Sequence, residues 1–496
     1  MKSVPNCPKL STLLLQSTYD LYEGLLNEGL PDAFFGHMPS LKVLDLSYTS
    51  IYFLPDSISN LVNLRALFLC HCSILTPVPS LAKLKELREL DLSGSIMTLP
   101  DGIEQLALLK CLALQGLSIK DMSLNRALPN LLHLQCLRLD DMGFLMVGIE
   151  ELIGLRKLEI LCIKLSSLDR FDWYMKTKHY QGLTHYYFEI CGGVWPPGNS
   201  PGREVDNYER WDEILPPRNS LGKEIGLCGC ELNQGREDND ECQLMLPTNI
   251  QLLEITECSL PTCLLDVSPS LKIARDLKVC SISECEGVEH LWCMEDCVAS
   301  LNYLYLDDLP DLNVLFKFRP INIVSCSSLK HLEVRSCGNL KHLFTHELVN
   351  HHLQNLQTIY VGKCKQMEDI IAATEDEEEG EEIDEMNNLL LYFPNLQSLE
   401  LRNLPELKSI WKGIMTRDSL QELKVWKCPK LRRLPLSVHI TDVDGERRAS
   451  ASPLKRIRGE KGWWERLEWD THPHAKSVFQ PLFISRNVFL VSVIFY

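Results

Sequence analysis

An α/β solenoid, built from short repeats that each supply one strand, is the fold class that this sequence predicts. The pattern L-x-x-L-x-L recurs with its first leucine at Leu41, Leu64, Leu87, Leu109 and Leu134. The steps between these leucines are 23, 23, 22 and 25 residues, all within the range of leucine-rich repeats. We therefore expect one curved leucine-rich-repeat solenoid, with short parallel strands on its concave face.

A second type of repeat follows in the later part of the chain. "LKHLEVRSC" from Leu329, "LQTIYVGKC" from Leu356 and "LQELKVWKC" from Leu420 each place a cysteine eight residues after the first apolar residue. Leucine-rich repeats carry Asn or Cys at this point, so we expect a small buried side chain at the turn that leaves the strand. The recurring cysteines are Cys72, Cys191, Cys258, Cys285, Cys337, Cys364 and Cys428. Counting degenerate units, the chain holds about 15 repeats.

Changes in composition divide the chain into four parts. Residues 1–191 form a first set of repeats, and residues 192–246 form an insertion rich in proline, glycine and charge that we expect to be partly disordered. Residues 247–440 form the second set, with a solvated acidic loop at 374–388. Residues 441–496 are predicted to be a tryptophan-rich C-terminal cap followed by an apolar tail.

Bulk composition excludes several classes of protein. The chain has 496 residues and a net charge of −17, which argues against a general nucleic-acid binder. No apolar stretch approaches the roughly 20 residues that span a bilayer. The N-terminus does not have the pattern of a signal peptide, and no usable Asn-x-Ser/Thr glycosylation site occurs. We expect a cytoplasmic protein whose cysteines are mostly free thiols.

Motifs of enzyme chemistry are weak in this sequence. No phosphate-binding G-x-x-x-x-G-K-S/T occurs, so no nucleotide cofactor is expected, and no metal site is expected either. "HELVNH" places His351 one residue away from the second histidine of a zinc-protease helix. Residues 198–202 match G-x-S-x-G, but the surrounding prolines favour a loop. We expect a protein that is not an enzyme; a hydrolase acting through Ser200 in the 192–246 insertion remains the alternative.

The residues between the leucines project from the strands and offer a surface for a partner. Tyrosines flanked by charged residues are enriched at the anchors of protein interfaces. Basic residues in the first set of repeats are suited to an acidic patch on a partner. The predicted protein-binding residues are Arg65, Arg88, Lys110, Arg138, Tyr303, Tyr305, Tyr360 and Lys424.

The stretches "LKVLDLSYTSIYFLPDSISNLVNLRALFL", "LKHLEVRSCGNLKHLF" and "WWERLEWD" resemble one family in particular. It is the plant intracellular disease-resistance proteins with a nucleotide-binding domain and leucine-rich repeats, coiled-coil branch. The resemblance covers about residues 5–483 and only the repeat region of the family. It implies a role in plant innate immunity, through recognition of a pathogen effector or a guarded host protein.

The resemblance also implies a contact with a nucleotide-binding domain, which this chain would have to make in trans. The family's P-loop does not occur in this sequence, so ATP binding is not carried over. A truncated, non-functional resistance-gene product is the remaining alternative.

Overall fold

The computed structural model divides into two units, Met1–Gly226 (unit 1) and Leu227–Tyr496 (unit 2). The structure describes residues 6–15, 30–76, 78–95, 99–116, 123–139, 148–192, 221–233, 244–293, 300–317, 328–372, 390–411, 414–416, 419–436, 439–443, 446–450, 453–469 and 475–485.

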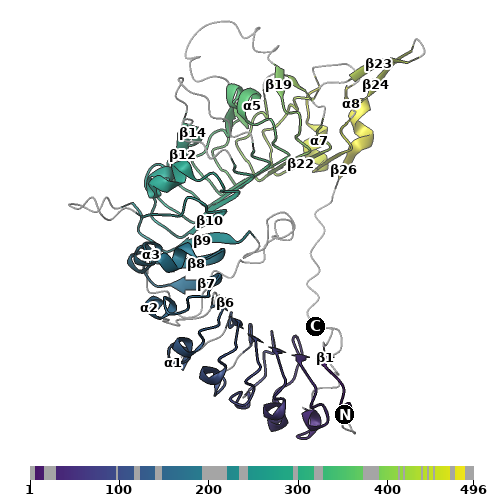
Figure 1. Ribbon diagram of the computed structural model, residues 1–496. Coiled ribbons are helices and arrows are strands. Elements are labelled where there is room, and N and C mark those ends of the chain that lie inside the picture. Colours follow the sequence, from purple (N-terminus) through teal and green to yellow (C-terminus); the bar gives the residue numbers. More distant parts are fainter. Residues whose placement is uncertain are drawn as a thin grey trace, which may run out of the picture. The chain divides into compact units, whose positions relative to one another are not determined.

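Unit 1 is a parallel ladder in which strands pair in chain order. Its strands are β1 (Thr12–Leu14), β2 (Val43–Asp45), β3 (Ala66–Phe68), β4 (Glu89–Asp91), β5 (Cys111–Ala113), β6 (Cys136–Arg138), β7 (Ile160–Leu165) and β8 (His185–Cys191). The next strand, β9 (Lys223–Cys228), reaches the boundary between the units. Figure 1 shows these strands stacked one per repeat.

The leucines of the repeat form the core of this ladder. Leu41, Leu44 and Leu46 are fully buried, and the corresponding leucines of the following repeats are buried as well. Each buried leucine side chain contributes about 1.5–3 kcal/mol relative to an exposed one. Because a single repeat has no second layer to cover these side chains, the apolar energy is gained only when neighbouring repeats stack.

The return segments of unit 1 are short helical turns that lie across from the strands (Figure 1). The 3-10 segment η2 (Asp56–Asn60) starts directly after Pro55, whose φ of −69° and ψ of 148° end the preceding extended stretch. Proline is suited to this point because it has no N–H that needs a partner. The other segments are η1 (Phe34–His37), η3 (Ile103–Gln105), α1 (Ser123–Ala127), η4 (Leu128–Asn130), α2 (Ile149–Leu152), α3 (Leu168–Met175) and α4 (Lys178–Gln181).

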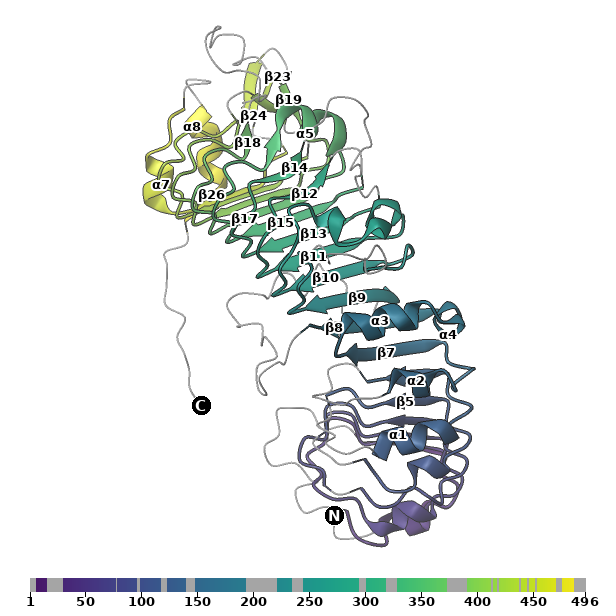
Figure 2. The same ribbon diagram turned by 90° about the vertical axis from the view of Figure 1, so that its left-hand side faces the viewer.

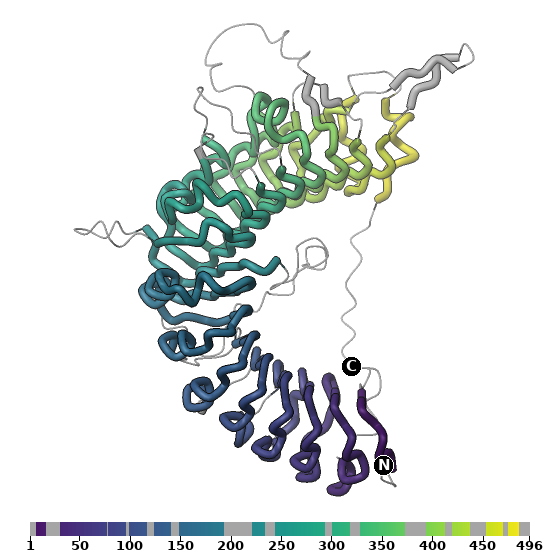
Figure 3. The backbone as a smooth tube through the Cα atoms, in the orientation of Figure 1, coloured from purple at the N-terminus to yellow at the C-terminus, as the bar shows by residue number. Residues whose placement is uncertain are grey.

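Unit 2 has a longer parallel ladder, and its strands pair over five residues in most repeats. The strands in order are β10 (Leu252–Thr256), β11 (Val279–Ser283), β13 (Tyr303–Asp307), β15 (His331–Arg335), β17 (Thr358–Gly362), β20 (Ser398–Arg402), β22 (Glu422–Trp426), β25 (Arg456–Gly459) and β26 (Phe483–Ser485). Figure 2 shows β10, β11, β13, β15 and β17 side by side, and Figure 3 shows the backbone advancing one strand per turn.

The return segments of unit 2 add two-stranded sheets and short helices. The parallel pairs are β12 (His290–Cys293) with β14 (Val314–Lys317), β16 (Phe344–Thr345) with β18 (Ile371–Ala372), and β19 (Leu390–Tyr392) with β21 (Ile414–Thr416). An antiparallel hairpin joins β23 (His439–Val443) and β24 (Glu446–Ser450). The helical segments are η6 (Leu264–Val267), η7 (Pro269–Ile273), α5 (His346–His352), α7 (Lys461–Glu465), α8 (Ala475–Phe479) and η9 (Gln480–Leu482).

The recurring cysteines are buried where the chain leaves each strand, as the sequence predicts. The N–H of Cys230 donates to Sγ of Cys258 at 3.3 Å, and the N–H of Cys258 donates to Sγ of Cys285 at 3.4 Å. The thiol of Cys258 donates in turn to the carbonyl of Thr256 at 3.3 Å. The thiols thus hold the turns of successive repeats together. Sixteen cysteines among the described residues are free of disulfides.

The structure differs from the expected domain organisation at two places. The insertion predicted over 192–246 contains β9, in which Ile225 and Leu227 are buried. The motif "IGLCGC" repeats the apolar and cysteine spacing of its neighbours, and the glycines around it obscure this pattern. Residues 193–220 and 234–243 of that segment, the acidic loop 374–388 and the tail from 486 lie outside the described residues.

The second difference concerns the C-terminal cap. The ladder does not end near residue 440, because β25 pairs with β22 and β26 pairs with β25. Trp463 and Trp464 of α7 are buried, and the Trp464 ring stacks on Phe483 at 4.5 Å between centroids. The predicted cap therefore includes two further strands, covered by tryptophans.

Candidate protein-binding face

The strand face of each unit carries the residues that sequence reasoning selected. In a strand, side chains alternate between the two faces, so the residues between the buried leucines lie on the face away from the core. We name four rows by their register in unit 2. The first row contains the first residue of each strand, the central row contains the third residue, and the third row contains the fifth residue. The turn row contains the residue that follows each strand.

Three of the four predicted basic residues of unit 1 are neighbours. Arg65, Arg88 and Lys110 each precede a strand, and the N–H of one donates to the carbonyl of the one before at 2.7–2.8 Å. The N–H of Arg65 donates to the carbonyl of Lys42 at 2.7 Å, which extends the row to four exposed cations. We name Lys42, Arg65, Arg88 and Lys110 the cation row. In the described part of the chain, none of the four forms an ion pair.

Arg138 is separated from the cation row. It is the last residue of β6 and pairs in register with Ala113 and Cys162, so it projects from a different position on the strand. Its side chain is half-buried beside Cys136, and the thiols of Cys136, Cys162 and Cys111 oppose the effect of burial and raise the pKa of the guanidinium. The structure therefore divides the four predicted residues into a row of three and one separate arginine.

In unit 2, two of the predicted tyrosines lie on β13. The half-buried Tyr303 stacks on His331 of β15 with 4.6 Å between ring centroids and an angle of 11°. Nδ1 of His331 is 2.7 Å from Oγ1 of Thr358, and burial of the ring lowers the pKa of His331 to about 4. Tyr305 is 9% exposed, and its hydroxyl donates to Oδ2 of Asp307 at 3.0 Å.

The central row holds a buried carboxylate between two tyrosines. Glu333 pairs in register with Tyr305 on one side and Tyr360 on the other, and it is fully buried although it lies on the face away from the leucines. Burial raises the pKa of Glu333 to about 8, and the neighbouring Arg335 guanidinium, which contacts the carboxylate, opposes this rise.

Tyr360 lies between two guanidinium groups. Cζ of Arg335 is 4.8 Å and Cζ of Arg402 is 6.0 Å from the centre of its ring, distances typical of cation–π contacts. The ring leans over Gly362, where a Cβ atom would lie 2.9 Å from the tyrosine hydroxyl. The glycine thus leaves the space that this ring occupies.

Lys424 is more buried than its prediction as a surface anchor implies. It is 8% exposed, and its Nζ lies 3.0 Å from Oε2 of Glu422 and 3.5 Å from Oε2 of Glu400. Glu422 also contacts Nε of Arg458 at 3.2 Å, and Glu400 contacts Nε of Arg402 at 2.5 Å. Lys424 therefore belongs to a network of charged side chains that extends over β20, β22 and β25.

Sequence reasoning did not select Glu333, Arg335, Gly362 or Arg402 as site residues. A signal was available, because alignment of the repeats places Arg335, Gly362 and Arg402 at one position and Glu333 at the position of Tyr305 and Tyr360. Burial of a carboxylate on the strand face could not be read from this alignment, since it depends on the tyrosines of the two adjacent strands.

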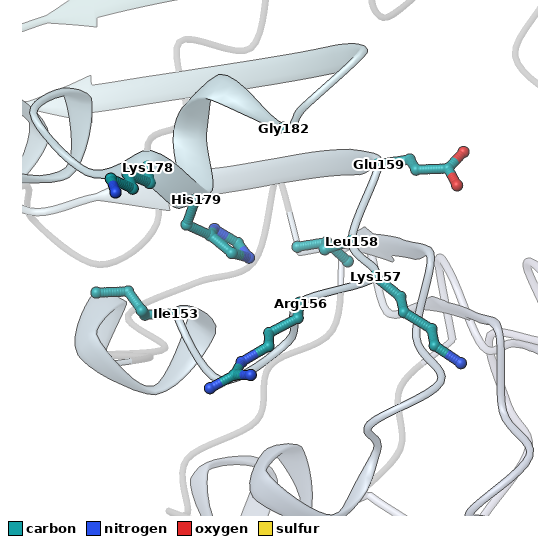
Figure 4. A pocket seen from close by; sticks show the side chains of 8 residues that line it. All are labelled: Ile153, Arg156, Lys157, Leu158, Glu159, Lys178, His179 and Gly182. Carbon is teal, nitrogen blue, oxygen red and sulfur yellow. The ribbon is translucent and has the colours of Figure 1, made fainter.

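A pocket of unit 1 lies away from the strand face. It has a volume of about 410 Å³ and is lined by residues of 153–159 and 178–182. Figure 4 shows His179 between Ile153 and Leu158, with Glu159 pointing away. Nδ1 of His179 is 2.7 Å from the Tyr174 hydroxyl, and Nε2 is 3.1 Å from the Leu155 carbonyl. Because both nitrogens have partners within the protein, this histidine holds the repeat together.

The structure describes only part of the motifs that resemble enzyme sites. Ser200 lies outside the described residues. His346 lies on α5, where its ring stacks on Trp411 at 5.1 Å. Among the residues that the structure describes, no group of three or more His, Cys, Asp or Glu side chains is placed to hold a metal ion. In the same residues, no helix combines the length and apolar character needed to cross a bilayer.

Two family models match the sequence. Residues 230–351 and 346–441 match the leucine-rich repeats described as plant disease resistance protein RPS2-like, and residues 25–74 match the general leucine rich repeat. A solved internalin from Listeria monocytogenes aligns with a TM-score of 0.38 and 14% identity, over 69% of this chain and 78% of that chain. The repeat fold itself rests on the strand ladder and on the family models.

The curated relatives agree with the family models. The disease resistance protein At4g27190 of Arabidopsis thaliana is 27% identical over 96% of this chain and 45% of the relative. The disease resistance protein RPS5 of Arabidopsis thaliana is 26% identical over 94% of this chain and 38% of the relative. The chain thus spans less than half the length of either relative. The chain is similar over most of its length to these plant disease resistance proteins, and residues 230–441 are similar to the leucine-rich repeats of that kind.

Proposed function

We propose that this chain is a non-enzymatic, protein-binding module of plant innate immunity, and that it binds its partner through the strand face of unit 2. The observation that carries the proposal is the cluster of Tyr303, Tyr305 and Tyr360 with charged neighbours on adjacent strands. Aromatic rings held rigidly by their own strands lose little entropy on binding, and such residues dominate the energy of many interfaces.

The partner in this proposal is a pathogen effector or a host protein that the module monitors. We further propose that the cation row of unit 1 contacts an acidic patch on a nucleotide-binding domain supplied in trans. Exposed charge pairs are screened by salt, so this second contact should weaken as ionic strength rises. We place the protein in the cytoplasm, which agrees with the free cysteines of the described residues.

A pull-down from plant extract tests both contacts. Wild type is compared with Tyr303→Ala, with Tyr305→Phe and with Arg65→Glu/Arg88→Glu, and thermal unfolding verifies that each variant is folded. Tyr305→Phe removes only the hydroxyl that donates to Asp307, so it preserves packing at a site that is 9% exposed.

We expect the tyrosine variants to lose a partner that wild type retains, and the arginine variant to lose a different partner in a salt-dependent manner. The matched control is Tyr52→Ala, which removes an aromatic ring that is 41% exposed on a return segment of unit 1. If the folded tyrosine variants and the control retain the same partners, the strand face of unit 2 is not the binding site.

A further inference from the structure

The turn row of unit 2 places charged residues where the backbone disfavours them. Its residues from β10 to β22 have φ between 50° and 58°, the left-handed region that glycine, asparagine and aspartate enter most easily. In unit 1 the same position also has a positive φ, at Tyr48, His71, Gly94 and Gly116, so the conformation belongs to the repeat and the charged side chains are particular to unit 2. From β10 to β22 the turn row of unit 2 consists of Glu257, Glu284, Asp308, Ser336, Lys363, Asn403 and Lys427. The residue after β25 is Glu460, whose φ is −77°.

The charges in this row are sorted by sign. Glu257, Glu284 and Asp308 follow three consecutive strands, β10, β11 and β13, whereas Lys363 and Lys427 follow β17 and β22. All five side chains are exposed, and none forms an ion pair among the residues that the structure describes. The pKa of Glu284 is raised by burial and then by the carboxylates of Glu257, Asp308 and Asp307. The carboxylates of the acidic end therefore repel one another, and no cation among the described residues forms an ion pair with Glu257, Glu284 or Asp308.

In the rows beside the turn row, the charge of the side chains also changes from negative to positive along the ladder from β10 to β25. The third row has Asp307 on β13, then Arg335 on β15 and Arg402 on β20. At the far end, β25 adds Arg456 and Arg458. Glu333, Glu400 and Glu422 pair with Arg335, Arg402 and Arg458. Among the exposed side chains that form no ion pair in the described part of the chain, Glu257, Glu284 and Asp308 make one end of the face acidic, and Lys363, Lys427 and Arg456 make the other end basic. Eight consecutive strands, from β10 to β25, carry this change.

We propose that this bipolar face binds one extended segment of a partner protein that is itself bipolar. Its basic end lies over the turns after β10, β11 and β13, and its acidic end lies over β17 to β25. This inference rests on the proposed function, since it specifies the chemistry of the partner at the same face. Complementary charge at both ends fixes the direction of the segment, because the reversed orientation would place like charges against each other.

The strand spacing sets the length of the segment. Neighbouring strands are about 4.8 Å apart, so seven steps between eight strands span about 34 Å. An extended chain advances about 3.3 Å per residue, which gives a segment of about ten residues. The tyrosines of the first and central rows lie near the middle of this span, where an uncharged part of the segment would pass.

Two synthetic peptides of the same composition test the proposal on the full chain. Each is about twelve residues long and contains equal numbers of lysine, glycine and aspartate. The block peptide carries its lysines at one end and its aspartates at the other, and the alternating peptide mixes them. Fluorescence anisotropy at low salt gives the dissociation constant of each. We expect the block peptide to bind about tenfold more tightly, and equal binding of the two peptides would overturn the proposal.

A charge reversal tests the residues. Lys363→Glu/Lys427→Glu should remove the preference for the block peptide, because both lysines of the turn row are then replaced by negative charges that repel the aspartates. The matched control is Lys83→Glu/Lys176→Glu, which makes the same change of charge at exposed positions on return segments of unit 1. A preference that persists in Lys363→Glu/Lys427→Glu, or that is lost equally in the control, would overturn the assignment.

A glycine variant separates binding from folding. Lys363→Gly/Lys427→Gly should raise the unfolding temperature, because glycine adopts the left-handed conformation without a steric penalty, while peptide binding weakens severalfold. Unchanged binding in this variant would contradict the proposal. The peptide readout does not depend on capture of a natural partner. A measured block preference with no partner in the pull-down would reject the proposed function and leave the bipolar face supported.

Discussion

The buried carboxylate of Glu333 should make the stability of unit 2 depend on pH in a direction opposite to that of most carboxylates. Its pKa is raised from 4.5 to about 8, mainly by burial, so the folded protein holds a proton that the unfolded chain releases. The stabilising contribution is fully present below pH 4.5 and is lost as the pH rises through about 8. One proton bound only by the folded state gives a slope of about −1.4 kcal/mol per pH unit in the free energy of unfolding.

Glu333→Gln removes this titration and keeps the shape of the side chain. Between about pH 5 and about pH 7.5, wild type should lose about 3 kcal/mol relative to the variant. Urea unfolding followed by tryptophan fluorescence measures the free energy at each pH, and Glu257→Gln is the control that removes an exposed carboxylate. If wild type and Glu333→Gln show parallel curves over this range, Glu333 is already ionised in the fold and the reasoning from burial is wrong.

Two further substitutions test the packing. Gly287→Ala should destabilise the protein by about 2 kcal/mol in urea unfolding, because the φ of Gly287 is 89° and a Cβ would lie 2.3 Å from the Leu260 carbonyl oxygen. The control is Gly338→Ala, in which the added Cβ meets no atom within 4 Å, so its effect on stability should be near zero. Trp464→Ala removes a buried ring that stacks on Phe483 and should cost about 3–5 kcal/mol. Hydrogen exchange should accelerate at β25 and β26 more than at β10; a uniform change would contradict a local capping role.

The sequence by itself determined the architecture of the repeats. The leucine pattern recurs every 22 to 25 residues, and no single repeat can cover its own apolar side chains. The repeats are therefore stable only when they stack on one another. The burial of Leu41, Leu44 and Leu46 follows directly from this spacing. The position of the recurring cysteine could also be read from the sequence, since it stands eight residues after the first apolar residue of its repeat.

Only the tertiary structure decided which side chains meet across the strands. The step from Leu356 to Leu396 is 40 residues, yet Thr358 still pairs with Ser398 in register. The extra residues of this step lie between β17 and β20 in the sequence, so the number of residues between two strands does not set their register. Register places Glu333 between two tyrosines and separates Arg138 from the cation row. The protonation of a buried carboxylate depends on such neighbours, which the order of residues along one strand does not contain.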